Sequence, residues 1–300
     1  MKLKDFVTLG NLLGGFAAVL ALFVIPDPWQ AFRWSCYLIY IGYVFDVLDG
    51  PIARLLKQQT TFGGHLDTIC DYITNSIAPS FILFHFYWKI GGLPWIVAAV
   101  VGAFPIVLGT IRQAQGMDRQ LSYPCYWIGL PRPVLTLFVL ALLNSSSMWF
   151  GLHLASPGRQ LVLGSTALLI AVMSLLHLSS LPFLNHSRRR WMMVLRFGMH
   201  MFLTMVPIVG LLSWLLLGAL WLVYDFILFD LIIYICISWS QNPKEDYRRI
   251  KTYLQGGPLV RPLVHKDNDW TPKTWAVYFL EDGPRERESG QVVLEQAKGG

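Results

Sequence analysis

Two apolar runs of the chain are joined by the stretch Asp46-Val-Leu-Asp49-Gly50-Pro-Ile-Ala53-Arg54, which continues after eight residues as Gly63-Gly-His-Leu-Asp67-Thr-Ile-Cys-Asp71. The flanking runs, 31–50 and 63–87, are each long enough to cross a hydrocarbon core of about 30 Å as a helix. Their short connection makes the two predicted helices antiparallel neighbours. The sequence therefore predicts a helical membrane protein with four carboxylates gathered at one membrane surface.

The four aspartates are spaced so that each pair shares a helix face. Asp46 and Asp49 are three residues apart at the end of the first helix, and Asp67 and Asp71 are four apart at the start of the second. Converging carboxylates repel one another, and Mg²⁺ or Mn²⁺, which prefer oxygen ligands, relieve that repulsion. The pattern predicts a site for two such ions. Helix capping is a weaker explanation, since one Asp per helix would be enough.

The composition supports a membrane protein and excludes other classes. Hydrophobic residues make up 54% of the 300 residues and charged residues 14%, against about 25% charged in soluble domains. The four cysteines are far apart, so neither a disulfide framework nor a zinc site is indicated. No basic stripe is interleaved with aromatic residues, which excludes a nucleic-acid partner.

Apolar windows of spanning length divide the chain. They fall near 6–25, 31–50, 63–87, 94–113, 133–150, 161–180, 196–214 and 216–238. We therefore expect an all-α, polytopic membrane bundle of about eight transmembrane helices. Residues 1–186 would form a core of six, and residues 187–240 would add two. Residues 241–300 would form a polar, partly disordered cytosolic tail, with a helix at Asn242–Leu254 and a strand at Thr274–Leu280.

Basic residues are distributed unevenly between the two sets of helix ends. Eleven lie on the side of the N-terminus: Lys2, Lys4, Arg54, Lys57, Arg112, Arg119, Arg132, Arg188, Arg189, Arg190 and Arg196. Three lie on the other side: Arg33, Lys89 and Arg159. An even number of spans puts both termini on one side, and the basic excess puts that side in the cytosol. We expect an integral protein of the cytoplasmic (inner) membrane with both termini cytosolic.

The charged stretch also resembles a known signature. The pattern D-x2-D-G-x2-A-R-x8-G-x3-D-x3-D is similar to that of the CDP-alcohol phosphatidyltransferase family. Its fixed positions are here Asp46, Asp49, Gly50, Ala53, Arg54, Gly63, Asp67 and Asp71. The resemblance runs from about residue 6 to 186. It implies an enzyme that transfers a phosphatidyl group from CDP-diacylglycerol to a small polar alcohol in the membrane, with release of CMP.

The resemblance also implies roles for single residues. The four aspartates Asp46, Asp49, Asp67 and Asp71 would hold two divalent ions, and Asp71 would also act as general base on the acceptor hydroxyl. The CDP site would be lined by Asp49, Gly50, Ala53, Arg54 and Gly63. Separately, Gly10 and Gly14 form a G-x-x-x-G pair, which packs helices within a chain or across a dimer, and we expect a homodimer.

Within the family, the chain is most similar to the integral-membrane phosphatidylserine synthases. The similar segments are Thr8-Leu-Gly-Asn11, Asp71-Tyr-Ile-Thr-Asn-Ser-Ile-Ala-Pro79, Gly129-Leu-Pro131-Arg132-Pro133 and Ser179-Ser-Leu-Pro182-Phe. In the second segment, Asn75-Ser76 replaces a Phe-Gly pair. An R-x-A-R-F-N element of those enzymes is here Arg112-Gln-Ala-Gln-Gly-Met117, which keeps only the first arginine.

These segments make L-serine the expected acceptor, with Arg112 and Arg132 binding its carboxylate. Glycerol-3-phosphate, inositol phosphate and choline are the alternatives. An ion or metal transporter is the rival class, but its carboxylates would lie near the midplane rather than at one membrane end. Asp225 and Asp230 are five residues apart in the last apolar window and do not form one site.

The charge asymmetry generates a test of orientation. We expect Lys298→Cys to be protected from a membrane-impermeant thiol reagent in intact cells and Ser156→Cys to react, after subtraction of the labelling of the unmodified chain. The opposite result would place the carboxylates outside the cell.

Overall fold

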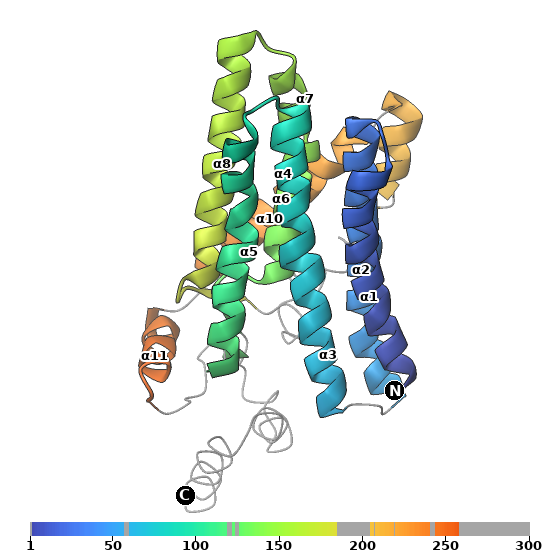
Figure 1. Ribbon diagram of the computed structural model, residues 1–300. Helices are drawn as coiled ribbons and strands as arrows, with labels where there is room; N and C mark the ends of the chain where they lie inside the picture. The colour runs from blue at the N-terminus through green and yellow to red at the C-terminus, as the bar shows by residue number, and fades with distance from the viewer. Residues whose placement is uncertain are drawn as a thin grey trace, which may run out of the picture.

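The computed structural model describes residues 2–56, 60–118, 122–123, 126–184, 205–206, 208–218, 220–240 and 244–257. Its first two helices, α1 (Leu3–Val24) and α2 (Pro28–Leu55), form an antiparallel pair joined by a short turn (Figure 1). Asp27 in this turn accepts a hydrogen bond from the Gln30 backbone N–H at 2.7 Å, which caps the start of α2.

Glycines let α1 and α2 approach closely. A Cβ atom at Gly14 would lie 2.8 Å from the Gly42 Cα atom and 2.9 Å from the Leu38 carbonyl oxygen, and one at Gly10 would meet the Phe45 ring. The G-x-x-x-G pair therefore packs two helices within the chain.

The next part of the chain is helical from Thr61 to Ile90, but not as a single α-helix. It consists of α3 (Thr61–Tyr72), the π-helical segment η1 (Ile73–Ile77), α4 (Ala78–His85) and a second π-helical segment, η2 (Phe86–Ile90). The Thr60 hydroxyl caps α3 by accepting a hydrogen bond from the Gly63 N–H at 3.1 Å. Each π-helical segment changes which residues face the neighbouring helices.

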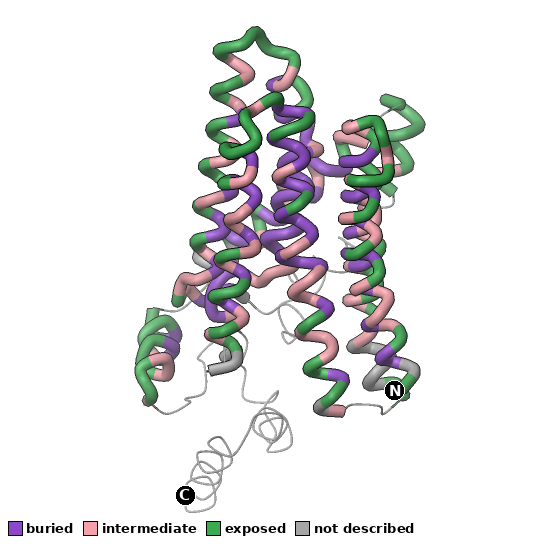
Figure 2. Tube along the Cα trace, viewed as in Figure 1, coloured by how far each residue is buried: buried purple, intermediate pink, exposed green. Residues whose placement is uncertain are grey.

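Helix α6 (Arg132–Asn144) is the buried helix of the bundle and packs against α4, α7 (Ser146–Leu152), α8 (Ser156–Leu178) and α10 (Trp221–Ser240). The other helices of this part of the chain are α5 (Trp95–Asp118), the helix Ile208–Leu217 and α11 (Lys244–Leu254). Every residue of α6 from Val134 to Leu143 is buried. Buried positions follow α4 and α6 on the inside, whereas exposed positions cover the outer faces of α5 and α8 (Figure 2).

A small antiparallel sheet, which the sequence did not predict, lies beside the helices. Strand β2 (Tyr126–Ile128) pairs with β1 (Ser122–Tyr123) on one side and with β3 (Pro182–Leu184) on the other. The sheet brings together the sequence segments Gly129–Pro133 and Ser179–Phe183, because β2 leads into Gly129 and β3 contains Pro182. Strand β2 ends four residues before α6 begins at Arg132.

The helices and their outer surface identify an integral membrane protein. Among the described residues, three helices are long and apolar enough to span a membrane: Lys4–Val24, Trp95–Gly116 and Ser156–Leu178. A fourth is obtained if α6 and α7, bent by 45° at their junction, count as one span. Large apolar side chains such as Phe23 and Leu161 are more than 70% exposed on the outer faces, which suits contact with lipid.

Three further predictions from the sequence have different outcomes in the structure. The window 63–87 is divided by π-helical segments, so that no unbroken α-helix of spanning length forms there. The helix predicted at Asn242–Leu254 is confirmed as α11, Lys244–Leu254. The predicted strand Thr274–Leu280, and the tail from residue 258 onward, lie outside the described residues.

The close contact of α1 and α2 gives a prediction about stability. We expect Gly14→Ala to cost about 1–3 kcal/mol, because its methyl group meets backbone atoms that have no room to move. The measurement is the Tm of the detergent-purified protein. Gly164→Ala is the matched control, since a Cβ atom at Gly164 meets nothing within 4 Å. An unchanged Tm for Gly14→Ala would contradict this packing.

Candidate metal and substrate site

The predicted carboxylates converge at one end of the bundle. Asp46 and Asp49 lie near the end of α2 and Asp67 and Asp71 on α3, at the same end as the N-terminus (Figure 1). One carboxylate oxygen from each of Asp46, Asp49 and Asp67 lies within 4.8 Å of the other two, and all three residues are partly buried.

Asp71 completes the cluster from one turn further along α3. Its carboxylate contacts that of Asp46. Its Oδ1 atom accepts a hydrogen bond from the Asn11 Nδ2 atom at 3.1 Å. The four predicted residues are thus brought together, three as one tight group and the fourth beside it.

Helix α1 supports the cluster with two polar side chains. The Thr8 hydroxyl donates to Asp49 Oδ2 at 2.9 Å, and the fully buried Asn11 holds Asp71. The Thr74 hydroxyl of η1 in turn donates to the Asn11 carbonyl oxygen at 3.0 Å. In the sequence, Thr8 and Asn11 belong to one of the segments that carry the family resemblance, and no separate role is predicted for them. Their spacing of three residues on one face of an apolar helix was the signal for a role at the site.

The residues of the cluster fit divalent cations. The Oδ1 atom of Asp67 is buried and has no hydrogen-bond partner among the described residues, so an acceptor atom is available at the cluster. Lys4 interacts electrostatically with Asp67, and Arg132 with Asp46 and Asp71. These two positive charges are fewer than the four carboxylates. A set of carboxylate oxygens suits Mg²⁺ or Mn²⁺.

The residues predicted to line the CDP site lie close to the cluster along the chain. Gly50, Ala53 and Arg54 continue α2 beyond Asp49, but their side-chain surroundings lie outside the described part of the protein. Gly63 is buried in α3, and a Cβ atom there would collide with the end of the Lys4 side chain. Its missing side chain therefore makes room for Lys4.

The two arginines that the sequence predicts to bind the acceptor have different surroundings. Arg132, at the start of α6, donates from Nη1 to the Oε1 atom of Gln113 on α5 at 2.6 Å, and its charge acts on the cluster. Sequence reasoning missed Gln113, which carries no motif of its own.

Arg112 is buried and donates from Nη1 to the carbonyl oxygen of His177 at 2.9 Å. Gly129, with φ of +75°, lies against both groups, and a Cβ atom there would come within 2.6 Å of each. Arg112 thus joins α5 to the end of α8 and to the turn that precedes α6.

The structure explains two features of the sequence, the Asn75-Ser76 pair and the acidic residue Asp225 in the last apolar window. The Thr136 hydroxyl donates to the Asn75 carbonyl oxygen, and Ser76 packs against Gly109, so Asn75-Ser76 belongs to a helix interface. Asp225 accepts a hydrogen bond from the Ser146 backbone N–H at 2.9 Å and caps α7.

Comparisons with known proteins identify a family and several relatives. The sequence profile of the CDP-alcohol phosphatidyltransferase family matches residues 1–196. The chain is 27% identical over 214 residues to a CDP-diacylglycerol–serine O-phosphatidyltransferase of Helicobacter pylori, which covers 71% of this chain and 85% of the relative. A protein of the same description from Methanocaldococcus jannaschii is 28% identical over 149 residues, 48% of this chain and 63% of the relative.

A third relative has another acceptor in its name. The CDP-diacylglycerol–glycerol-3-phosphate 3-phosphatidyltransferase of Escherichia coli K12 is 28% identical over 130 residues, 43% of this chain and 69% of that protein.

The bond from Thr8 to Asp49 predicts an effect on metal affinity. Thr8→Val keeps the side-chain shape but removes the donor that orients Asp49, and such orienting contacts are worth roughly 10–100-fold in metal affinity. Loss of the free-ion EPR signal on titration with Mn²⁺ measures this directly. Thr252→Val is the control, because Thr252 donates within α11 to the Arg248 carbonyl oxygen. Equal Mn²⁺ binding by Thr8→Val and the unmodified protein would contradict the role of Thr8.

Proposed function

The chain belongs to the CDP-alcohol phosphatidyltransferase family and is a CDP-diacylglycerol-dependent phosphatidyltransferase, and on this premise we propose that it is a divalent-metal-dependent enzyme whose acceptor is L-serine. The reaction would give phosphatidylserine and CMP. The observation that carries the metal dependence is the convergence of Asp46, Asp49 and Asp67 within 4.8 Å.

The metal ligands of the proposal are Asp46, Asp49, Asp67 and Asp71, with two Mg²⁺ or Mn²⁺ ions as cofactors. When bound, such ions neutralise the charge of a pyrophosphate and of the departing nucleotide. Thr8 and Asn11 orient Asp49 and Asp71 through their hydrogen bonds. Asp49, Gly50, Ala53, Arg54 and Gly63 form the CDP site of the proposal, in which Arg54 supplies a guanidinium suited to phosphate.

Asp71 is the proposed general base. Its carboxylate takes the proton of the serine hydroxyl as that oxygen bonds to the phosphorus of the phosphatidyl group. The bond from phosphorus to the CMP oxygen then breaks, and CMP leaves with the electron pair. The hydrogen bond from the Asn11 side chain orients this carboxylate by engaging its Oδ1 atom.

Arg132 is the proposed partner of the serine carboxylate. Its charge already acts on Asp46 and Asp71, and Gln113 fixes its guanidinium. Arg112, the second predicted acceptor residue, holds His177 and the Gly129 turn, so we propose that it shapes the acceptor site by positioning Arg132.

Membrane placement is part of the same proposal. Eight transmembrane helices, with both termini on the cytosolic side of the cytoplasmic membrane, would put the carboxylates on the cytosolic face. The nucleotide would then bind at that surface while the acyl chains stay in lipid. The predicted homodimer stays a prediction, because the G-x-x-x-G pair packs within the chain.

Other acceptors are the second candidate. The E. coli relative is named for glycerol-3-phosphate, and Arg132 would suit its phosphate as well as a carboxylate. Inositol phosphate and choline are further alternatives. A transporter fits less well, because the carboxylates belong to residues near the end of α2 and in α3, at one end of the bundle and not at the midplane.

The decisive experiment measures CMP release from CDP-diacylglycerol by the purified protein. The acceptors compared are L-serine, glycerol-3-phosphate, inositol phosphate and choline. We expect release with L-serine and Mn²⁺ or Mg²⁺, and none after EDTA treatment or in Asp49→Asn. Asp27→Asn is the matched control, because Asp27 only caps α2. Release only with another acceptor would disprove the serine assignment, and full turnover in EDTA would disprove the metal dependence.

The contact proposed for Arg132 has its own signature. Arg132→Ala should raise the serine KM about tenfold to a hundredfold, at about 1.4 kcal/mol per tenfold, while the KM for CDP-diacylglycerol changes little. Arg159→Ala is the control, because that guanidinium donates to the carbonyl oxygens of Ile90 and Gly91. Equal changes in both KM values would show that Arg132 does not distinguish the acceptor.

A further inference from the structure

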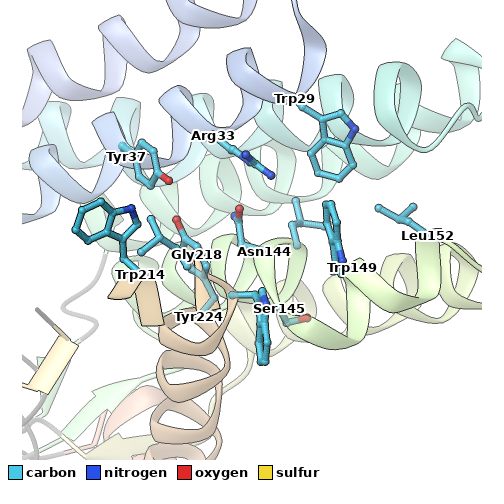
Figure 3. Close-up of a pocket in the computed structure, with 13 residues that line it drawn as sticks. Trp29, Arg33, Tyr37, Asn144, Ser145, Trp149, Leu152, Trp214, Gly218 and Tyr224 are labelled. Carbon is cyan, nitrogen blue, oxygen red and sulfur yellow. The ribbon is translucent and has the colours of Figure 1, made fainter. Parts of the chain in front are cut away.

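A cavity of about 350 Å³ lies at a distance from the carboxylates. Helix α2 forms one side, the junction of α6 and α7 the second, and the helix Ile208–Leu217 with the start of α10 the third (Figure 3). Arg33 of this cavity and Asp46 are 13 residues apart on α2, or about 20 Å at 1.5 Å per residue. The cavity is therefore separate from the proposed active site.

Aromatic side chains dominate the cavity. Its walls contain Trp29, Trp149, Trp214, Trp221, Tyr37 and Tyr224. Tryptophan and tyrosine gather at membrane–water interfaces, where an apolar ring lies beside a polar group. The Trp29 ring makes edge contacts with those of Phe32, Phe86 and Trp149, which fixes it in place. The walls are thus a packed aromatic surface at one end of the helices.

Arg33 brings a positive charge to this aromatic cavity. Its guanidinium carbon lies 5.9 Å from the centre of the Trp29 ring, and Figure 3 shows Arg33 on the side of the cavity opposite Asn144. The structure records no ion pair for Arg33 with any carboxylate of the described residues. Asp225 contacts the chain beside Ser145 of the cavity wall, where one of its carboxylate oxygens accepts a hydrogen bond from the Ser146 N–H. Among the described residues that line the cavity, Arg33 therefore brings a positive charge with no carboxylate in an ion pair with it.

From this juxtaposition we propose that the cavity binds the phosphate group of an anionic phospholipid, with Arg33 as its partner. A guanidinium matches phosphate oxygens in a bidentate manner. The same charge would repel a quaternary ammonium group, which aromatic walls alone would favour. Trp34 and Leu216, which are close in the chain to Arg33 and Trp214, expose 54% and 75% of their surface, and these apolar surfaces suit acyl chains. This lipid is a ligand distinct from the CDP-diacylglycerol substrate, and the proposal does not depend on the acceptor.

The test compares lipids on the full-length protein in detergent. Dioleoyl phosphatidylglycerol should raise the Tm of the unmodified protein, and dioleoyl phosphatidylcholine and inorganic phosphate should not. Arg33→Gln should weaken the phosphatidylglycerol titration about tenfold. Arg33→Lys should keep most of it, because the charge remains. Arg159→Gln, whose arginine is bound by backbone carbonyl oxygens, should titrate like the unmodified protein. Asp49→Asn should also retain the response, which separates this cavity from the active site.

Three results would overturn the proposal. These are an equal response to phosphatidylcholine, an equal response to phosphate alone, and an unchanged titration of Arg33→Gln. If Arg33→Gln does not fold, Trp214→Leu takes its place, because Trp214 is 60% exposed and its truncation removes one wall of the cavity. The same tenfold weakening is then expected, and an unchanged titration would count against the proposal. Both Arg33→Gln and Trp214→Leu should turn over CDP-diacylglycerol at the rate of the unmodified protein when no phosphatidylglycerol is added.

Discussion

Mutual repulsion of carboxylates is the constraint on which the rest of the structure depends. At an effective dielectric constant of 20, two unit charges 4 Å apart interact by about 4 kcal/mol, whereas a typical hydrogen bond contributes about 1 kcal/mol net. The bonds from Thr8 and Asn11 therefore cannot hold the ionised cluster together by themselves. Close packing of the surrounding helices opposes the repulsion, and the positive charges of Lys4 and Arg132 reduce it. Gly14 against Gly42 supplies such packing for α1 and α2.

The sequence predicts the parts of this arrangement that depend on local spacing. Asp46–Asp49 and Asp67–Asp71 fall on shared helix faces, and the short connection after α2 brings the two faces together, as the structure confirms. The amphipathic segment that became α11 is equally local. By contrast, the contact of Asn11 with Asp71 joins residues 60 positions apart, and no local pattern encodes it. Strands of two or three residues and π-helical segments of five are too short to leave a periodic signal.

Arg112 and Arg132 show why a motif alone does not assign roles. In the sequence both are basic residues beside apolar runs, and both were predicted to bind the acceptor. In the fold, Arg112 is buried against a backbone carbonyl group, whereas Arg132 interacts with Asp46 and is held by Gln113. The environment distinguishes them: the guanidinium of Arg112 is engaged by a backbone carbonyl group, whereas the charge of Arg132 reaches the carboxylates.

The C-terminal helices connect the two ends of the bundle. Near its start, α10 supplies Tyr224 to the aromatic cavity, and further along Asp230 interacts electrostatically with Tyr43, which also interacts with Asp46. In α11, the buried Asp246 accepts a hydrogen bond at 2.9 Å from the hydroxyl of Tyr126 in β2. Tyr126 is three residues before Gly129, where the turn that leads to Arg132 begins. Both helices lie beyond residues 1–196, which the family profile matches. A ligand in the aromatic cavity would therefore contact the start of the same helix whose Asp230 interacts with Tyr43, a residue that also interacts electrostatically with Asp46.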